Sequence, residues 1–357
     1  MFNTKNLRSI VINSFNPGSS IYRYTSFLNY INNNFIINIV NNKNKWNKKH
    51  LGMDFYGRFN NKYLNFLLPK YAYNNIERYI KNENVLLHYA SQTSTIFFKS
   101  DYRLVTVHDN PFSEFETNLY FDKNSYTNKL LTKYYKYTFK KYVMTSPYIT
   151  ANTDYVKNSV IDYGYVGYIE TIYIPVAPAF RHLNIDKMAL RKELNLPYDK
   201  ILLLSVSTDV YKKNLKLVYK LDNIINNNYR IVRVGTPVGN SINFSNIDDE
   251  TLNKIYNACD LLLFPSLEEG QGLPVIEAFK TGLPVVASDI DVLREVSNNN
   301  AVFINPYDVN SLYNGINEAL ERSDELINNG YKESEKYSID IFINKMNNLY
   351  DRILNNK

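Results

Sequence analysis

The chain has 357 residues, of which 45% are hydrophobic and 21% charged, and its formal net charge is +6. This length suits two domains of ordinary size, and the apolar fraction is high enough for real hydrophobic cores. The single cysteine, Cys259, excludes an internal disulfide and favours a reducing compartment. No apolar run approaches the length that spans a bilayer, and the first residues are typical of a strand, so we expect a cytoplasmic protein.

Charge is unevenly distributed along the chain. Residues 1–150 contain 20 Lys and Arg against 8 Asp and Glu, whereas the remainder contains 21 against 27. This asymmetry suggests that the N-terminal half meets an anionic partner.

In the first half of the chain, short apolar strands alternate with helical stretches. A loop at Gly18 follows the first strand, and the residues from Tyr22 to Asn33 predict a helix. This alternation is typical of a parallel α/β domain. The expected strands are Ser9–Ser14, Phe35–Val40, Asn84–Tyr89, Leu104–Asp109 and Tyr148–Asn152.

The second half repeats the pattern after a proline-containing linker, Thr171–Phe180. We expect an N-terminal domain over 1–175, a C-terminal domain over 176–335, and a terminal helix over 336–357 that packs back toward the N-terminal domain. The expected strands of the second sheet are Ile201–Val206, Ile231–Gly235, Leu261–Phe264, Val285–Ser288 and Ala301–Asn305, and the closing helices are Asn310–Arg322 and Lys332–Leu354.

One segment, Pro265–Asp289, carries most of the functional information. It reads strand, glycine loop, helix, strand, which is a parallel crossover whose loop opens at the carboxyl edge of the sheet, where ligands bind in open α/β sheets. Gly270 and Gly272 let backbone N–H groups approach a ligand, and the N-terminus of the helix that begins near Pro274 favours negative charge.

Phosphate on these amides, with sugar hydroxyls on Glu269 and Glu277, would describe a site for a phosphorylated sugar or a nucleotide-sugar. A glycine loop by itself is a weak signal, and an ordinary crossover with solvated glutamates is the alternative at this point.

The string E-G-x-G-L-P-x-x-E-A-x-x-x-G-x-P-V-V-A-S-D, Glu269 to Asp289, resembles the signature of retaining glycosyltransferase family 4. The resemblance implies an α/β protein of the GT-B fold, with two Rossmann-like parallel-sheet domains that face an interdomain cleft. In the family the first glutamate contacts the transferred sugar and the second the donor ribose. Those roles carry over to Glu269 and Glu277.

Other positions extend the resemblance. Lys213, in Val206–Asn214, matches the lysine that grips the donor phosphates, and Ser207 or Thr208 stands where many members carry an arginine. In Leu104–Asp109, His108 matches a histidine that lies against the donor sugar, although a buried structural histidine is the alternative. The catalytic candidates are therefore Glu269, His108 and Lys213. The donor-binding candidates are Glu277, Gly18, Lys212, Asn214, Gly270, Gly272, Leu273 and Glu295.

The resemblance implies a retaining, metal-independent hexosyltransferase that needs no cofactor beyond its substrate, a UDP- or GDP-sugar. The acceptor is a hydroxyl of a glycan, a lipid-linked molecule or a protein. A catalytically inactive sugar-binding or scaffold protein is the alternative. A nicotinamide-dependent oxidoreductase is disfavoured because the first loop lacks G-x-G-x-x-G, and nucleic-acid binding has no recognised motif beside the basic half.

A basic stripe in the N-terminal half suggests a peripheral position at an anionic membrane. Lys129, Lys133, Lys136 and Lys140 recur at helical spacing beside Leu130, Leu131, Tyr134 and Tyr137. The segment Asn42–His50 also places Trp46 among four lysines. Tryptophan and tyrosine favour membrane interfaces, and lysines favour anionic lipid. A solvated charged face is the alternative.

Overall fold

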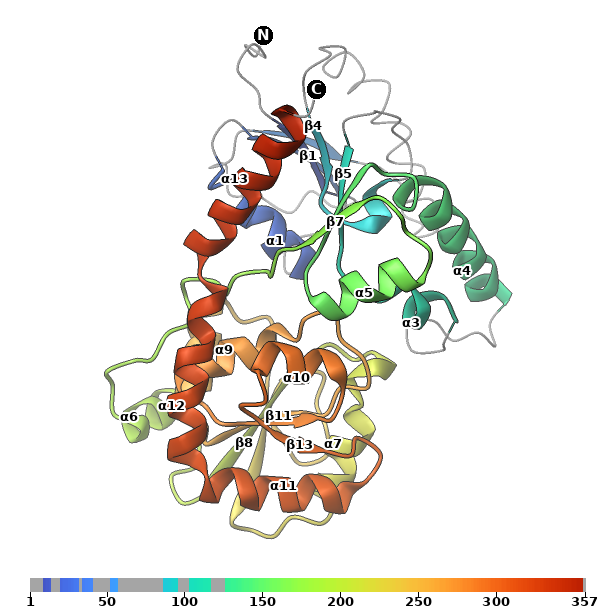
Figure 1. Ribbon diagram of the computed structural model, residues 1–357. Coiled ribbons are helices and arrows are strands. Elements are labelled where there is room, and N and C mark those ends of the chain that lie inside the picture. The colour runs from blue at the N-terminus through green and yellow to red at the C-terminus, as the bar shows by residue number, and fades with distance from the viewer. Residues whose placement is uncertain are drawn as a thin grey trace. The chain divides into compact units, whose positions relative to one another are not determined.

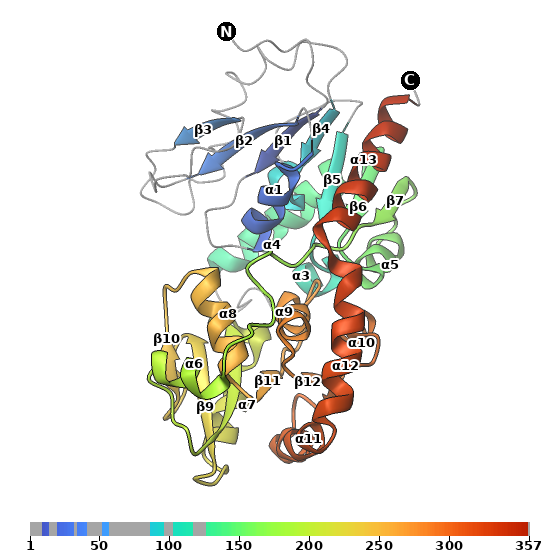
Figure 2. The ribbon, with the colours of Figure 1, turned by 90° about the vertical axis from the view of Figure 1, so that its left-hand side faces the viewer.

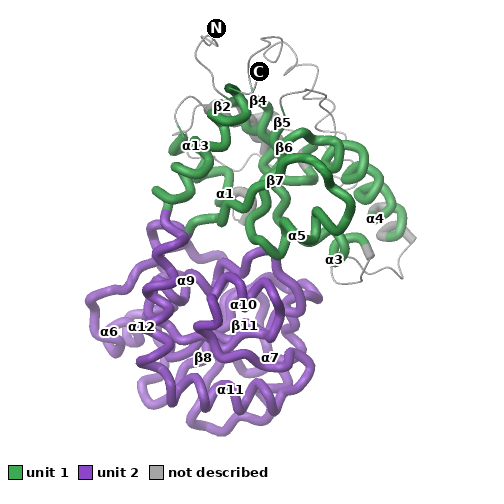
Figure 3. The backbone as a smooth tube through the Cα atoms, viewed as in Figure 1, with its two compact units in different colours: residues 1–116, 123–175, 339–357 green, residues 117–122, 176–338 purple. Residues whose placement is uncertain are grey.

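The computed structural model describes residues 9–13, 20–31, 34–40, 52–56, 86–95, 103–116 and 126–355. Two compact units make up the chain (Figure 3). Unit 1 takes the described residues within 1–116, 123–175 and 339–357, and unit 2 takes those within 176–338. Within the described ranges, no helix has both the length and the apolar character that crossing a bilayer requires.

Unit 1 contains a seven-stranded sheet in the order β3-β2-β1-β4-β5-β6-β7, with all its pairings parallel (Figures 1 and 2). The first six strands in this order follow the Rossmann arrangement. The elements of unit 1 are β1 (Ser9–Asn13), α1 (Ser20–Leu28), β2 (Asn34–Val40), β3 (Gly52–Tyr56), β4 (Leu86–Tyr89), β5 (Arg103–Val107), α3 (Pro111–Glu116), α4 (Tyr126–Thr138), β6 (Tyr148–Ala151), α5 (Asp154–Asp162), β7 (Tyr168–Thr171) and α13 (Ile339–Asn355).

The sheet of unit 1 is covered on both faces, which explains why its central strands are buried throughout. Because successive side chains of a strand point to opposite faces, Leu87 and Tyr89 pack into a cluster with Phe139 and Val156, from the helical side formed by α3, α4 and α5. His88, between them in the strand, points to the face covered by α1 and α13.

Unit 2 contains a six-stranded parallel sheet in the order β10-β9-β8-β11-β12-β13, which is again the Rossmann arrangement. Its elements are α6 (Lys187–Glu193), β8 (Ile201–Ser207), α7 (Leu215–Asp222), β9 (Tyr229–Gly235), β10 (Ile242–Phe244), α8 (Asp249–Ala258), β11 (Leu261–Phe264), α9 (Leu273–Thr281), β12 (Val285–Ser288), α10 (Asp291–Ser297), β13 (Val302–Ile304), α11 (Val309–Glu321) and α12 (Ser323–Ser334).

Helices also cover both faces of this second sheet. Leu203, Leu263 and Val286 pack with side chains of α7 and α11, such as Leu217 and Ile316, while α8, α9 and α10 lie against the other face (Figures 1 and 2). With both faces buried, the strands are continuous apolar runs, as parallel sheets require, and the polar residues gather in the loops at the strand ends.

Three strands were not predicted from the sequence: β3, β7 and β10. Each lies at the edge of its sheet, where a strand has only one neighbour and need not be apolar on both faces. Their sequences, GMDFY, YIET and INF, mix polar and apolar residues and give no buried-strand signal.

The prediction of one helix over Lys332–Leu354 was wrong, because the helical conformation is interrupted at Ser338, between α12 and α13. A short 3-10 turn, Glu335–Tyr337, ends α12, and Ser338 has extended backbone. The side chain of Tyr337 is buried and its hydroxyl donates to the Val296 carbonyl, while the Tyr337 backbone carbonyl accepts from the Val176 N–H. This carbonyl therefore leaves the helical ladder, and Ser338 occupies the position that precedes a helix, where serine is favoured.

Candidate functional site

The candidate site of unit 2 lies at the point where the strand order of its sheet reverses. Strands β8 and β11 are neighbours in the sheet, and the helices that follow them, α7 and α9, lie on opposite faces of the sheet. In open α/β sheets ligands bind at this position, outside the carboxyl ends of the strands. The turn that contains Lys213 follows β8, and the loop that contains Glu269 follows β11.

Lys213 and Glu269 form an ion pair between these two loops. Lys213 Nζ lies 2.5 Å from Glu269 Oε1, and the two side chains are 16% and 7% exposed. The ammonium also lies over the ring of Phe264, at 5.6 Å from its centroid. A carboxylate this deeply buried requires a cation or several hydrogen bonds, and Lys213 provides the cation.

Backbone and amide hydrogen bonds fix the turn after β8. The Leu267 N–H donates to the Lys212 carbonyl at 2.7 Å, so the two loops are joined beside the ion pair. Asn214 has a φ of 54°, a left-handed conformation that asparagine tolerates, and its Nδ2 donates to the carbonyls of Pro265 and Pro306. Asn214 therefore ties together the ends of β8, β11 and β13.

Glycine is required at the start of α9. Gly272 has a φ of 75°, and a Cβ there would lie 2.7 Å from a methyl group of Leu293. Leu273 is the first residue of the helix, so the backbone amides at this point have no partners within the helix. Gly270, one turn of the loop earlier, is buried.

Glu277 is 3% exposed on α9 and accepts a hydrogen bond from the Tyr256 hydroxyl, at 2.9 Å. Tyr256 comes from α8, so two helices on one face of the sheet hold this carboxylate. Sequence reasoning missed Tyr256, because a tyrosine within the helical stretch NKIYNACD has the pattern of an ordinary core residue. Glu295 lies half-buried on α10. Among the described residues, His, Cys, Asp and Glu side chains form no group of three that could hold a metal ion.

In unit 1, His108 follows β5 and is 5% exposed. Its Nε2 lies 2.7 Å from the Ala90 carbonyl, which can only accept, so Nε2 carries the proton. Burial lowers the pKa of His108, and the Ala90 carbonyl and Asp109 act in the opposite direction. The imidazole is thus neutral near pH 7, and Nδ1 is its unprotonated nitrogen. The ring of Tyr24 packs edge to face against it at 5.1 Å.

His88 lies within the core of unit 1. Its Nδ1 lies 2.6 Å from the Tyr350 hydroxyl of α13, and its Nε2 lies 2.8 Å from the Thr106 hydroxyl. Burial and the charge of His108 lower the pKa of His88 to about 3. Both ring nitrogens are therefore engaged inside the unit. Gly18 and the segment around Trp46 lie outside the described residues.

Two units, each with a Rossmann strand order, define a GT-B fold, and solved structures agree. The chain is similar to sucrose-phosphate synthase from Thermosynechococcus elongatus, with a TM-score of 0.78, 16% identity, and coverage of 98% of this chain and 100% of that one. It is similar also to HepE from Anabaena in complex with UDP and glucose, with a TM-score of 0.75, 15% identity, and coverage of 96% and 99%.

Residues 186–336 match the family described as glycosyl transferases group 1. The O-antigen chain mannosyltransferase RfbU of Salmonella typhimurium is 37% identical over 75 residues, which is 21% of each chain. An uncharacterized glycosyltransferase of Methanocaldococcus jannaschii is 24% identical over 208 residues, or 51% of this chain and 53% of that protein. The matched regions thus span between about a fifth and a half of these two curated relatives.

Proposed function

We propose that the chain is a retaining glycosyltransferase of family 4, which moves a sugar from a nucleoside-diphosphate donor to an acceptor hydroxyl. The observation that carries the proposal is the Lys213–Glu269 pair, at 2.5 Å, at the point where the strand order of unit 2 reverses. The pair places a cation that can bind phosphate beside a carboxylate that can accept hydrogen bonds from hydroxyls. Both lie at the edge of the sheet where ligands bind. The family match over residues 186–336 supports the same reaction class.

In the proposed complex the donor separates this ion pair. The diphosphate takes over Lys213, with the amides at the start of α9 near Gly272 and Leu273, and the sugar hydroxyls take over Glu269. The cost of breaking a short ion pair is offset because each partner gains a charge-assisted hydrogen bond. Glu277 holds the ribose hydroxyls. We assign contact with the transferred sugar to His108 as well, and contact with the donor phosphates to Gly18, Lys212 and Glu295.

The proposed chemistry retains the anomeric configuration. The bond between C1 and the phosphate oxygen breaks through an oxocarbenium-like state, and its electron pair goes to the phosphate. The acceptor oxygen then bonds to C1 on the face that the phosphate leaves, and the acceptor proton moves to the departing phosphate. The ammonium of Lys213 stabilises the negative charge that develops on that phosphate. No step in this scheme needs a metal ion or a protein nucleophile.

The relatives suggest where a search for substrates should begin. The Salmonella relative is named an O-antigen chain mannosyltransferase, and the Anabaena structure contains UDP and glucose. We therefore propose mannosyl and glucosyl donors as the first candidates, and a growing glycan, lipid-linked or free, as the acceptor.

A panel of UDP-, GDP- and ADP-sugars tests the proposal. A specific donor should raise the melting temperature by mass action, and it should release its nucleoside diphosphate when an acceptor is added. Product analysis by NMR should show the anomeric configuration of the donor. Stabilisation without turnover against any acceptor would favour the inactive sugar-binding alternative, and inversion of configuration would exclude family 4.

A further inference from the structure

Arg233 is the largest fully buried side chain of the described residues, with 0% exposure. It lies near the carboxyl end of β9, opposite Ser205 of β8, two residues before the strand ends at Gly235. Its guanidinium therefore sits beneath the turn that follows β8, the turn that contains Lys212 and Lys213.

Among the described residues, the guanidinium donates only to neutral oxygen atoms. Nη1 donates to the carbonyls of Ser205 and Val234, and Nη2 donates to the carbonyl and the hydroxyl of Ser207, at distances between 2.5 and 3.0 Å. Within the described residues Nε has no hydrogen-bond partner. Gly235 makes this packing feasible, because a Cβ there would lie 2.2 Å from the Ser207 carbonyl.

The charge of Arg233 is not neutralised by an ion pair in the part of the chain that is described. Asp209, the acid whose charge acts on it, is exposed to solvent and so is screened. Burial lowers the pKa of Arg233 to about 10, so the side chain stays charged near pH 7. A buried cation held only by dipoles is costly for the free protein, and it favours a site where an anion arrives with the ligand.

The neighbouring cation differs in this respect. Lys213 is already paired with Glu269 at 2.5 Å, so that pair contributes no net charge to the site before a ligand binds. Arg233 contributes a full positive charge at the same edge of the sheet, from the adjacent strand. A donor diphosphate would approach this charge with few mobile ions between them, because the guanidinium is excluded from water.

We propose that Arg233 supplies the positive charge that balances the donor diphosphate at this site. It is a positioning residue: it fixes the end of β8 through Ser207 and acts on the phosphates through its field, without touching them. The inference rests on the proposed function, since it requires a nucleoside diphosphate as ligand.

The test compares Arg233→Met with Arg230→Met. Arg230 lies at the other end of the same strand, near the solvent, and donates to the Asn240 carbonyl, so it controls for the loss of one charge. Binding of UDP, UMP and uridine, or of the guanosine series if GDP binds better, is measured by calorimetry or ligand-observed NMR. Arg233→Met should weaken diphosphate binding about tenfold, monophosphate binding less, and nucleoside binding hardly at all. Arg230→Met should change none of them more than about twofold.

Equal losses for all three ligands would overturn the proposal, because they would mark Arg233 as purely structural; so would unchanged diphosphate binding in a folded variant. If Arg233→Met does not fold, Arg233→Lys tests the proposal instead. A buried lysine deprotonates at a lower pH than a buried arginine, so its charge is lost as the pH rises. Diphosphate affinity should therefore fall between pH 7 and 9, while nucleoside affinity does not. A flat pH profile would overturn the proposal. Absence of nucleotide binding in the unmodified chain would overturn the proposed function itself, and this inference with it.

Discussion

At the scale of single residues, Glu269 and Lys213 stabilise each other in the charged state, which is the state that the proposed ligand binds. The carboxylate is 7% exposed and the ammonium 16%, and each is the other's ion-pair partner at 2.5 Å. Either side chain alone would be a partly buried, uncompensated charge. The variants below therefore test binding and stability together, and each needs a measurement of both.

Glu269→Gln should reduce transfer at least about a hundredfold, because the variant keeps the shape of the side chain and removes the charge that stabilises the reacting sugar. Turnover with the identified donor measures this loss, and near-ultraviolet circular dichroism checks the fold. Glu268→Gln is the matched control, since Glu268 is the adjacent carboxylate and is 8% exposed. Near-normal turnover by a folded Glu269→Gln protein would remove Glu269 from the mechanism.

Lys213→Ala should weaken binding of UDP or GDP about tenfold or more and slow turnover, with little effect on acceptor affinity, because a charge-assisted hydrogen bond to phosphate is lost. Calorimetry with the free nucleotides provides the measurement. Lys216→Ala, an exposed lysine on α7 one turn away, is the control. If the affinity and rate of Lys213→Ala match the unmodified chain, Lys212 or another group holds the phosphates.

At the scale of elements, the sequence predicted the parts whose local pattern is strong. The crossover from β11 through α9 to β12 was predicted because apolar runs and glycines mark its boundaries, and both glutamates lie on it as the signature implies. Asn214 was predicted to bind the donor, and in the structure its side-chain amide donates hydrogen bonds to the carbonyls of Pro265 and Pro306. These hydrogen bonds join the ends of strands that are far apart in the sequence, so a local sequence pattern cannot predict them.

Arg233 shows the same limit more clearly. An arginine between two valines in IVRVG has the pattern of an exposed strand position, but in the structure it is buried beside the neighbouring strand β8. The segment Val206–Asn214 contains no arginine of its own, yet the structure brings one to Ser207 from the next strand. The edge strands β3, β7 and β10 were missed for a related reason, since their mixed sequences give a weak apolar signal.

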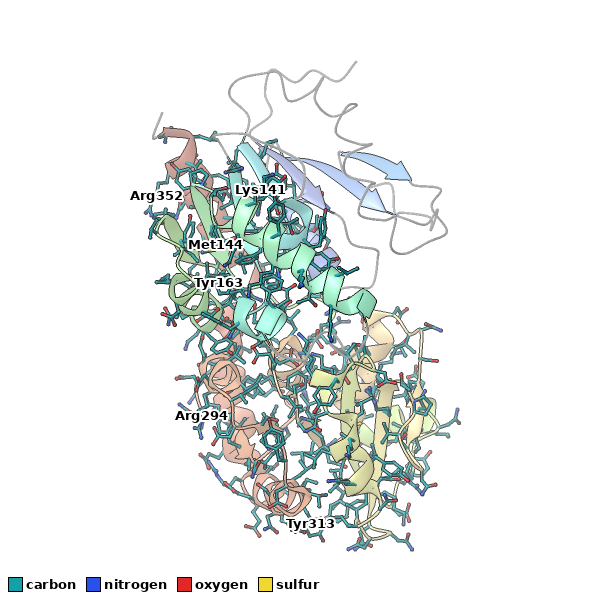
Figure 4. The ribbon with its side chains drawn as sticks, turned by 90° about the vertical axis from the view of Figure 1, so that its right-hand side faces the viewer. Lys141, Met144, Tyr163, Arg294, Tyr313 and Arg352 are labelled. Carbon is teal, nitrogen blue, oxygen red and sulfur yellow. The ribbon has the colours of Figure 1, made fainter. Side chains whose placement is uncertain are left out.

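The predicted basic stripe lies on helix α4 and on the π-helical turn that follows it, Phe139–Val143. Lys129, Lys133 and Lys140 are exposed, as are Leu130 and Tyr137, at 51% and 56%. Lys141, labelled in Figure 4, follows Lys140 in this turn and donates to the Tyr137 hydroxyl. The helix thus combines basic side chains with apolar and aromatic groups, the composition that favours an anionic membrane surface.

We expect the protein to bind vesicles that contain anionic lipid at low salt and to be released at high salt. Replacement of Lys129, Lys133, Lys136 and Lys140 by Gln should weaken binding at least about tenfold, since each lysine near such a surface contributes on the order of 1 kcal/mol. Co-sedimentation measures it. Four exposed lysines of unit 2 form the charge-matched control: Lys187, Lys192, Lys216 and Lys220. Equal vesicle binding by both variants would show that these lysines form an ordinary solvated face and do not bind the membrane.

At the scale of the whole molecule, the stability of unit 1 depends on polar groups in its core. His88, Thr106, Tyr24 and Tyr350 form one hydrogen-bonded network between the sheet, α1 and α13. The network is satisfied with a neutral imidazole, because Nδ1 and Nε2 each face a hydroxyl group. A proton added to His88 would place a charge in the core, and its hydrogen-bond partners among the described residues are hydroxyl groups with no carboxylate.

Unit 1 should therefore lose stability in mild acid. The unfolded chain protonates His88 near pH 6.5, whereas the folded chain does so only near its lowered pKa of about 3, so the stability is complete above pH 6.5 and is lost as pH falls toward 3. One such proton gives a slope of about 1.4 kcal/mol per pH unit. Denaturant titrations at several pH values, followed by hydrogen exchange in unit 1, measure it. His88→Gln should be less stable at pH 7 and should show a shallower slope; an unchanged slope would contradict the assignment.

The interruption at Ser338 returns the chain to unit 1, with α13 supplying Phe342 and Tyr350 to a core that the first strands began. The described residues of unit 2, 176–338, are continuous in sequence, and all of them are synthesised before α13. This segment can fold while the chain is still being made, but the face of the first sheet that α13 covers stays uncovered until α13 has been synthesised. Until then Tyr24 and Phe27 lack the ring of Phe342 that they pack against, so the N-terminal half is the part that needs protection during synthesis.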